Sequence, residues 1–183
     1  VFNVVPGFGP TAGAALVTHE QVDQIAFTGS TPVGQEILRA SAGTLKRVTL
    51  ELGGKSPNIV FADADMDAAV RGATIGIFYN EGQVCTAASR LLVEESIREP
   101  FLEKLADRAK KTVPGDPLDP KCRYGPQVSE EQMSRILRYI GIGKEEGARL
   151  VAGGSRAKVG DGKGYYVEPT IFDGVRNDMT IAR

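Results

Sequence analysis

The sequence has few of the side chains that bind metal ions. Its 183 residues include only two cysteines and one histidine, His19. A zinc site takes three or four protein ligands, so these residues could form one only if carboxylates completed the set. We therefore predict no metal centre. We also expect no disulfide between Cys85 and Cys122, because nothing in the sequence indicates secretion. Cys122 is interpreted as a loop thiol without a functional role.

The sequence also lacks long apolar runs and an excess of charge of either sign. No stretch reaches the ~18 apolar residues of a membrane-spanning helix, and no charged and then apolar leader opens the chain. Lys and Arg number 22 against 23 Asp and Glu, which gives a formal net charge of −1. The longest basic cluster, residues 108–111, reads as the solvated end of a helix. We expect a cytoplasmic protein with no membrane or nucleic-acid partner.

The remaining composition is that of an ordinary globular protein, with 42% hydrophobic and 25% charged residues. Strand and helix signals alternate along most of it, which is typical of a parallel α/β arrangement. Strands are predicted over residues 1–5, 24–27, 47–52, 58–61 and 90–94, with further β-prone runs at 149–152 and 164–172. Helices are predicted over residues 10–18, 32–42, 67–79, 97–112 and 129–146, and a proline-rich loop over 114–126.

A glycine pair, Gly53-Gly54, interrupts this alternation near the end of the third predicted strand. Glycine permits chain reversals that β-branched residues resist, so we predict a domain boundary there, with domains over residues 1–53 and 54–183. The sequence opens in a strand-like run without an initiator Met and stops without a polar tail. We expect it to be an internal piece of a longer protein.

Two glycine-rich turns follow predicted strands and precede predicted helices. The turn over residues 7–12 fits G-x-G-x-x-A, and the turn over residues 29–34 contains two hydroxyls and two glycines. Free N–H groups at a helix N-terminus can bind a pyrophosphate. An ordinary dinucleotide fold also needs an acidic residue at the end of the next strand, where this sequence has Thr28-Gly29-Ser30. Spacing alone therefore leaves two interpretations of the second turn, a phosphate site or a helix capped by Ser or Thr.

Cys85 and Glu51 are the candidate reactive residues. Cys85 follows Gly82-Gln83-Val84 just beyond a predicted helix, where a thiol among small and polar residues is suited to attack a carbonyl. Glu51 ends an apolar strand and could act as a general base. The alternatives are a buried, inert thiol for Cys85 and an ion pair with Lys55 for Glu51. The sequence contains no G-x-S-x-G motif, which disfavours a Ser/His/Asp hydrolase.

Taken together, three motifs resemble the aldehyde dehydrogenase superfamily. They are residues 27–34 (FTGSTPVG), 51–55 (ELGGK) and 82–85 (GQVC), and they occur in the order and at the spacing of that family. The likeness extends over nearly the whole chain, including residues 6–9 and 166–170. It implies an α/β fold in which the end of a Rossmann-variant coenzyme domain is followed by most of an α/β catalytic domain.

The resemblance also implies a role for each motif. Cys85 would be the nucleophile and Glu51 the general base in the oxidation of a small-molecule aldehyde. NAD or NADP would bind with its pyrophosphate against the second glycine-rich turn, which the family uses in place of the ordinary dinucleotide turn. The implied cofactor-binding residues are Gly29, Ser30, Thr31, Val33, Gly34 and, near the nicotinamide, Leu52.

Other parts of the family's site would lie outside this sequence, among them an oxyanion-hole Asn, a ribose-binding Lys and a Phe-Gly-Pro motif. The resemblance implies a homo-oligomeric complete subunit, and the isolated chain is expected to be weak or inactive. Water is the expected acyl acceptor, because family members that use coenzyme A commonly lack the glutamate at position 51. Tyr79, Val84 and Thr86 are candidates for the aldehyde-binding walls. The other hypotheses are a non-catalytic module and a cofactor-independent thiol esterase that uses Cys85 and Glu51.

Overall fold

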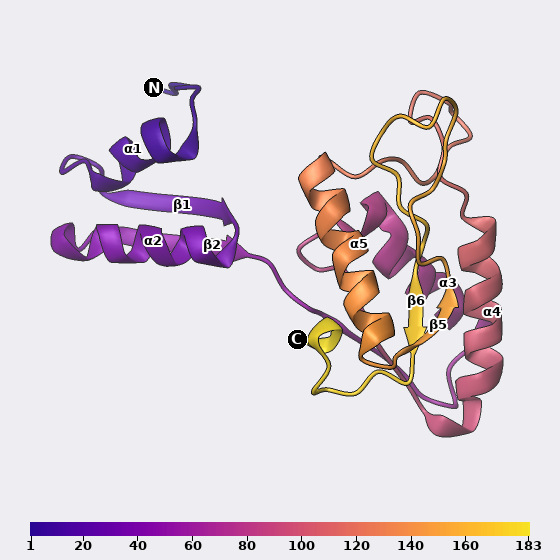
Figure 1. Ribbon diagram of the computed structural model, residues 1–183. Helices are drawn as coiled ribbons and strands as arrows, with labels where there is room; N and C mark the ends of the chain where they lie inside the picture. The colour runs from indigo at the N-terminus through magenta and orange to yellow at the C-terminus, as the bar shows by residue number, and fades with distance from the viewer. The chain divides into compact units, whose positions relative to one another are not determined.

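The computed structural model describes all 183 residues. They form two compact units, Val1–Gly54 and Lys55–Arg183, drawn in Figure 1. The division falls beside the glycine pair at which the sequence predicts a domain boundary. Each unit contains a strand–helix–strand segment whose two strands are parallel. None of the helices is both long and apolar enough to cross a membrane.

The first unit is built around one parallel strand pair. Strands β1 (Gln24–Gly29) and β2 (Arg47–Leu52) align with Gln24 opposite Arg47 and Gly29 opposite Leu52. Helix α2 (Thr31–Ser41) connects them, followed by the 3₁₀ turn η2 (Ala42–Thr44). A π-helical turn, η1 (Gly9–Gly13), and the short helix α1 (Ala14–Thr18) precede the pair.

Only one face of this strand pair is covered. Alternate residues along both strands are half-buried, and those between them are exposed. A methyl group built on Gly34 would lie 3.0 Å from Leu52 Cδ2 and 3.4 Å from Leu50 Cδ1, so α2 packs on the face that carries these leucines. The opposite face carries Thr28 and Glu51, which are exposed.

A buried lysine closes the C-terminal end of α1. Lys46 is only 9% exposed, and its Nζ donates hydrogen bonds of 2.7 Å to the carbonyl oxygens of Val17 and His19. The last carbonyls of a helix have no partners within the helix. The ammonium group therefore gives the Val17 carbonyl a donor and gives the His19 carbonyl a second one, beside the Val22 N–H.

The second unit begins with another parallel pair. Strands β3 (Pro57–Val60) and β4 (Arg90–Val93) are connected through α3 (Met66–Phe78) and the 3₁₀ turn η3 (Tyr79–Gly82). The rest of the unit contains η4 (Glu95–Ile97), α4 (Arg98–Lys111), α5 (Glu130–Glu145), β5 (Arg149–Ala152), β6 (Ile171–Asp173) and η5 (Thr180–Ala182). Strands β5 and β6 are antiparallel, with a register shift between Leu150 and Ala152.

The core of this unit lies on both sides of the β5–β6 pair, which Figure 1 shows between α5 and α4. Phe172 of β6 packs with Met133 and Ile140 of α5. Its neighbour Ile171 packs towards the other side, against clusters that contain Phe78 of α3 and Phe101 of α4. Because successive strand residues point to opposite faces, one short strand joins the two halves of the core.

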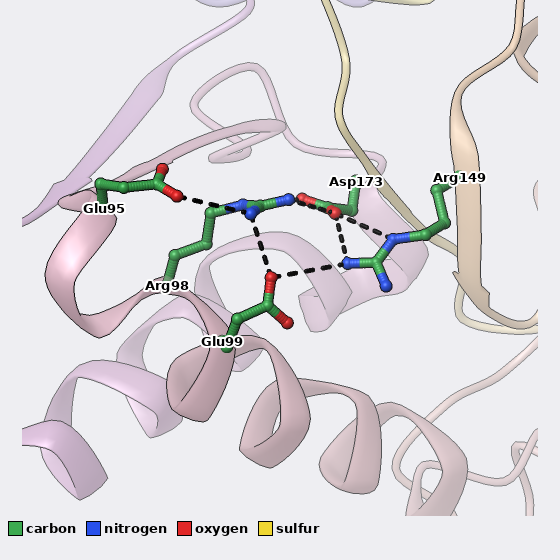
Figure 2. Close-up of polar contacts among 5 residues, drawn as sticks. All are labelled: Glu95, Arg98, Glu99, Arg149 and Asp173. Atoms are coloured by element: carbon green, nitrogen blue, oxygen red, sulfur yellow. Dashed lines mark hydrogen bonds and ion pairs between the residues drawn. The ribbon is translucent and has the colours of Figure 1, made fainter.

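An ion-pair network also ties β6 to α4 and β5, as Figure 2 shows. Asp173 accepts hydrogen bonds from Arg98 Nη2 at 2.7 Å and from Arg149 Nη2 at 2.6 Å. Glu95 pairs with Arg98 at 3.7 Å, and Glu99 pairs with both arginines, at 3.0 Å from Arg98 and 3.9 Å from Arg149. Burial acts to raise the pKa of Asp173, but the hydrogen bonds from Arg149 and Arg98 outweigh it, so the pKa lies below its ordinary value.

Two helix starts agree closely with the sequence pattern. Asp65 Oδ1 accepts a hydrogen bond of 2.7 Å from the backbone N–H of Ala68, at the start of α3. Ser129 Oγ accepts one of 3.2 Å from the backbone N–H of Gln132, at the start of α5. These are the capping contacts that Asp and Ser make at helix N-termini.

Other predicted elements differ from the structure. The predicted strand over residues 1–5 is wrong: these residues are exposed and form no strand, because no neighbouring strand pairs with them. The predicted helix over 10–18 begins as a π turn. The β-prone run over 164–172 forms only a single bridge, from Val167 to Arg156, before β6 begins at Ile171.

Candidate functional site

The first unit brings the predicted cofactor-binding residues together at the carboxyl end of its parallel strands. Gly29 ends β1 directly opposite Leu52, the last residue of β2. Ser30 follows at the N-cap of α2, and Gly34 in the first turns of that helix packs on Leu52. The carboxyl ends of parallel strands are where open α/β sheets bind ligands.

Ser30 has the backbone conformation of an N-cap but not the side-chain bond of one. Its φ of −80° and ψ of 150° are extended, while its hydroxyl makes no capping hydrogen bond. Its carbonyl accepts the Gly34 N–H at 3.0 Å, and Pro32 lies in the first turn. The turn is therefore not built on a Ser hydroxyl cap. The exposed residues Thr31 and Val33 lie in the same first turn, where helix N–H groups lack intrahelical partners.

The candidate base Glu51 lies one residue before the end of β2, opposite Thr28 of β1. Strand alternation places it on the face opposite Leu50 and Leu52, and it is exposed. The first unit thus presents a carboxylate on one face of the strand pair and a helix N-terminus at the carboxyl end of the same pair.

The candidate nucleophile, Cys85, belongs to the second unit and has an exposed side chain. It lies in a turn that the Ala87 N–H closes onto the Val84 carbonyl at 3.0 Å. The next residue, Ala88, donates its N–H to the Gly76 carbonyl of α3 at 2.9 Å. The alternative interpretation of Cys85 as a buried thiol is therefore wrong. The structure holds it on a turn fixed to α3.

The backbone just before this turn is unusual. Asn80, Glu81 and Gly82 all have positive φ, at 48°, 55° and 77°. The Gln83 N–H donates to the Asn80 carbonyl at 2.9 Å, and Asn80 Nδ2 donates to the Gln83 carbonyl at 3.2 Å. Left-handed conformations are uncommon for residues other than glycine. Three in succession reverse the chain between the end of α3 and Cys85.

Two side chains of this segment bind the loop before α5. Glu81 Oε1 accepts the Gly125 N–H at 2.6 Å, and Gln83 Oε1 accepts the Val128 N–H at 3.1 Å. Sequence reasoning missed both contacts. The only local signal is Asn-Glu-Gly directly after a helix, which indicates a turn but not its partner.

An aromatic pair lies beneath this contact. Tyr124, beside Gly125, is 4% exposed and packs edge-to-face on Phe78, with ring centroids 6.2 Å apart. Burial, and secondly the charge of Glu81, raise the pKa of Tyr124 to about 12. The phenol is therefore neutral at physiological pH.

The remaining candidate residues around Cys85 differ in exposure. Tyr79 is 70% exposed, Thr86 is exposed and Val84 is half-buried. Cys122 is a free, half-buried thiol whose Sγ contacts the Tyr124 carbonyl oxygen at 3.4 Å. The structure contains no group of three or more His, Cys, Asp or Glu side chains that could hold a metal ion.

The chain is thus an α/β protein whose first unit has a glycine-rich turn at the carboxyl end of two parallel strands and whose second unit has an exposed thiol on a turn. The sequence profile described as "Aldehyde dehydrogenase family" matches residues 1–183. The chain belongs to the aldehyde dehydrogenase family, and with it the predicted fold class is confirmed.

Known proteins resemble the chain over its whole length. Human "Aldehyde dehydrogenase, mitochondrial" is 54% identical over 184 residues, which cover 100% of this chain and 35% of that protein. The crystal structure of the aldehyde dehydrogenase KauB from Pseudomonas aeruginosa has a TM-score of 0.96 and 52% identity, covering 100% of this chain and 37% of that one. An NAD⁺ complex of aldehyde dehydrogenase from Bacillus cereus has a TM-score of 0.94 and 50% identity, covering 98% and 36%. The chain thus spans about a third of the length of these relatives.

Proposed function

We propose that the complete protein containing this chain oxidises an aldehyde to a carboxylic acid with NAD or NADP. The observation that carries the proposal is the exposed Cys85 on a turn fixed to α3, in a chain of the aldehyde dehydrogenase family. Because the chain spans about a third of its relatives, the proposal concerns the complete polypeptide. We expect that polypeptide to form a homo-oligomer.

The turn over residues 29–34 is the proposed pyrophosphate site. It supplies a helix N-terminus, a Ser30 hydroxyl that is not used as a cap, and glycines that keep side chains out of the turn. Leu52, which packs against Gly34, would lie near the nicotinamide. When bound, NAD or NADP supplies an acceptor for the hydride that leaves the substrate.

Cys85 carries the first chemical step of the proposal. Its thiolate attacks the aldehyde carbon, and the carbonyl π electrons move to oxygen to give the oxyanion of a thiohemiacetal. The Cys85 backbone N–H would donate to the developing oxyanion, and one such donor contributes about 3 kcal/mol to transition-state stabilisation. Once the oxyanion has lost its hydride, Cys85 would carry the acyl group as a thioester.

Glu51 carries the second step. Its carboxylate would take a proton from water as that water attacks the thioester carbon, and collapse of the tetrahedral intermediate releases the acid and the Cys85 thiolate. The exposed position of Glu51 on β2 supports this role, because a general base must reach a water molecule. Water is therefore the proposed acyl acceptor.

The test uses the complete protein and measures reduced-cofactor formation with a panel of aldehydes. We expect Cys85→Ser to abolish turnover and Cys122→Ser, the matched control, to leave it near wild type. Glu51→Gln should keep a burst of hydride transfer and slow the steady state, because deacylation loses its base. Wild-type turnover by Cys85→Ser would remove the nucleophile assignment. Hydrolysis of esters without cofactor, with no aldehyde oxidation, would favour the thiol esterase instead.

A further inference from the structure

We propose that Glu81 is a positioning residue that sets the placement of the Cys85 thiol, through its hydrogen bond to the Gly125 N–H. This inference rests on the proposed function, because placement matters only if Cys85 reacts with substrate. Glu81 itself contacts backbone rather than any reacting atom.

The backbone before Cys85 is left-handed over three successive residues. Gly82 adopts its φ of 77° at no steric cost, and asparagine tolerates the left-handed region better than most residues. Glu81, with φ of 55°, is the residue in this series that has no intrinsic preference for it. A conformation of this kind persists only where the surroundings enforce it.

A hydrogen bond to the loop before α5 can enforce the left-handed conformation of Glu81. Glu81 Oε1 accepts the Gly125 N–H at 2.6 Å across 44 residues of sequence. A charged acceptor makes a stronger hydrogen bond than a neutral one. The carboxylate therefore fixes the side chain, and with it the left-handed backbone of residue 81. Gln83 makes a second, weaker contact to the same loop through Val128.

The residues on both sides of Gly125 are themselves held in place. The Tyr124 carbonyl, one residue before Gly125, accepts the Gly115 N–H at 3.0 Å. On the other side, the N–H of the buried Gln127 donates to the Tyr165 carbonyl at 2.8 Å. The Tyr124 ring is packed on Phe78 of α3. Gly125 is thus held in place, and its hydrogen bond to Glu81 fixes the position of the segment that leads to Cys85.

Loss of the Glu81–Gly125 hydrogen bond should displace the Cys85 thiol without unfolding the second unit. The buried cluster around Phe101 does not include Glu81 or Gly125. The turn at Cys85 begins three residues after Glu81, so relaxation of residue 81 to a right-handed conformation would redirect the chain before the nucleophile. A displacement of about 1 Å at a reacting group can reduce a rate about 100-fold.

The experiment compares three variants of the complete protein. Glu81→Ala removes the acceptor, Glu81→Gln keeps a side-chain oxygen, and Glu103→Ala alters an exposed glutamate of α4 as the matched control. We expect Glu81→Ala to lower kcat between about 10-fold and 100-fold while KM for aldehyde and for cofactor stays within about twofold. Glu81→Gln should recover most of kcat, and Glu103→Ala should match wild type.

A second measurement reports the placement of the loop without catalysis. Hydrogen exchange of the amides at Gln83 and Ala87, both hydrogen-bonded, should be about tenfold faster in Glu81→Ala than in wild type and unchanged in Glu103→Ala. Wild-type kcat and exchange in Glu81→Ala would overturn the proposal. So would equal loss of kcat and of melting temperature in both Glu81 variants. If wild type oxidises no aldehyde while exchange still rises in Glu81→Ala, the proposed function fails and the positioning contact stands.

Discussion

The two units support their candidate residues in different ways. The first unit covers one face of its strand pair with α2, and its few buried side chains include Val17, Ile37 and Lys46. The second unit encloses a strand pair between helices and buries Phe101 to 1% exposure. In the first unit the candidate cofactor residues lie at the carboxyl end of a strand pair that is covered on one face only. In the second unit the thiol lies on a turn that is hydrogen-bonded to a helix of the buried core. Substitutions should therefore affect the two units separately.

The largest effect is expected from the core of the second unit. Phe101→Ala should destabilise that unit by about 3–5 kcal/mol, because it removes a fully buried ring and leaves a cavity among neighbours that include Val60 and Val70. Hydrogen exchange of α3 and α4 should accelerate while that of α2 stays unchanged. Leu118→Ala, at a residue 88% exposed, is the control and should have little effect. Equal acceleration in both units would show that they unfold together.

An intermediate effect is expected from the buried lysine of the first unit. Lys46→Met keeps the chain length but removes the donor to the Val17 and His19 carbonyls, at a cost of about 2–3 kcal/mol. Exchange of α1 amides should rise and that of α4 should not. Arg47→Met, at the exposed neighbouring position, is the matched control. A Lys46→Met protein as stable as that control would show that these carbonyls need no buried donor.

The smallest effect is expected from the ion-pair network of the second unit. Asp173→Asn should cost about 1–2 kcal/mol near neutral pH, because Arg98 and Arg149 are 33% and 58% exposed and solvent screens their attraction. Denaturant unfolding should show it, with Asp63→Asn, at an exposed position, as control.

The pH dependence of this effect has a definite sign. The pKa of Asp173 is lowered below its ordinary value of 3.8 in the folded protein. Its contribution is therefore fully present above the unfolded value and is lost as the pH falls through the folded one. The difference in unfolding free energy between wild type and Asp173→Asn should be constant above about pH 5 and shrink towards pH 2. A difference that grows on acidification would contradict the assignment.

Local patterns in the sequence predicted much of the fold. The bounds of β2, residues 47–52, match the prediction, because an apolar alternation ends at a glycine pair. The starts of α3 and α5 follow from capping residues that act on their own helices. The strand predicted over residues 1–5 failed because strand formation depends on a partner, which local composition does not contain.

The candidate site, too, could be predicted from the sequence only in part. Cys85, Glu51 and the turn over residues 29–34 were predicted from motifs, and their roles remain predictions for the experiments above. The Glu81–Gly125 contact joins residues 44 apart. No periodicity or spacing links such positions, so the interaction becomes visible only when the chain is folded.

The position of β6 late in the sequence has a consequence for how the second unit forms during synthesis. Asp173 meets Arg98 across 75 residues, and Met179, at 2% exposure, is among the largest fully buried side chains. Ribosomes deliver the chain from its N-terminus, and contacts distant in sequence form slowly. The core surfaces of α3, α4 and α5 therefore emerge before the strand that lies between them. The parts of these helices that Ile171 and Phe172 cover therefore stay exposed until β6 has been synthesised.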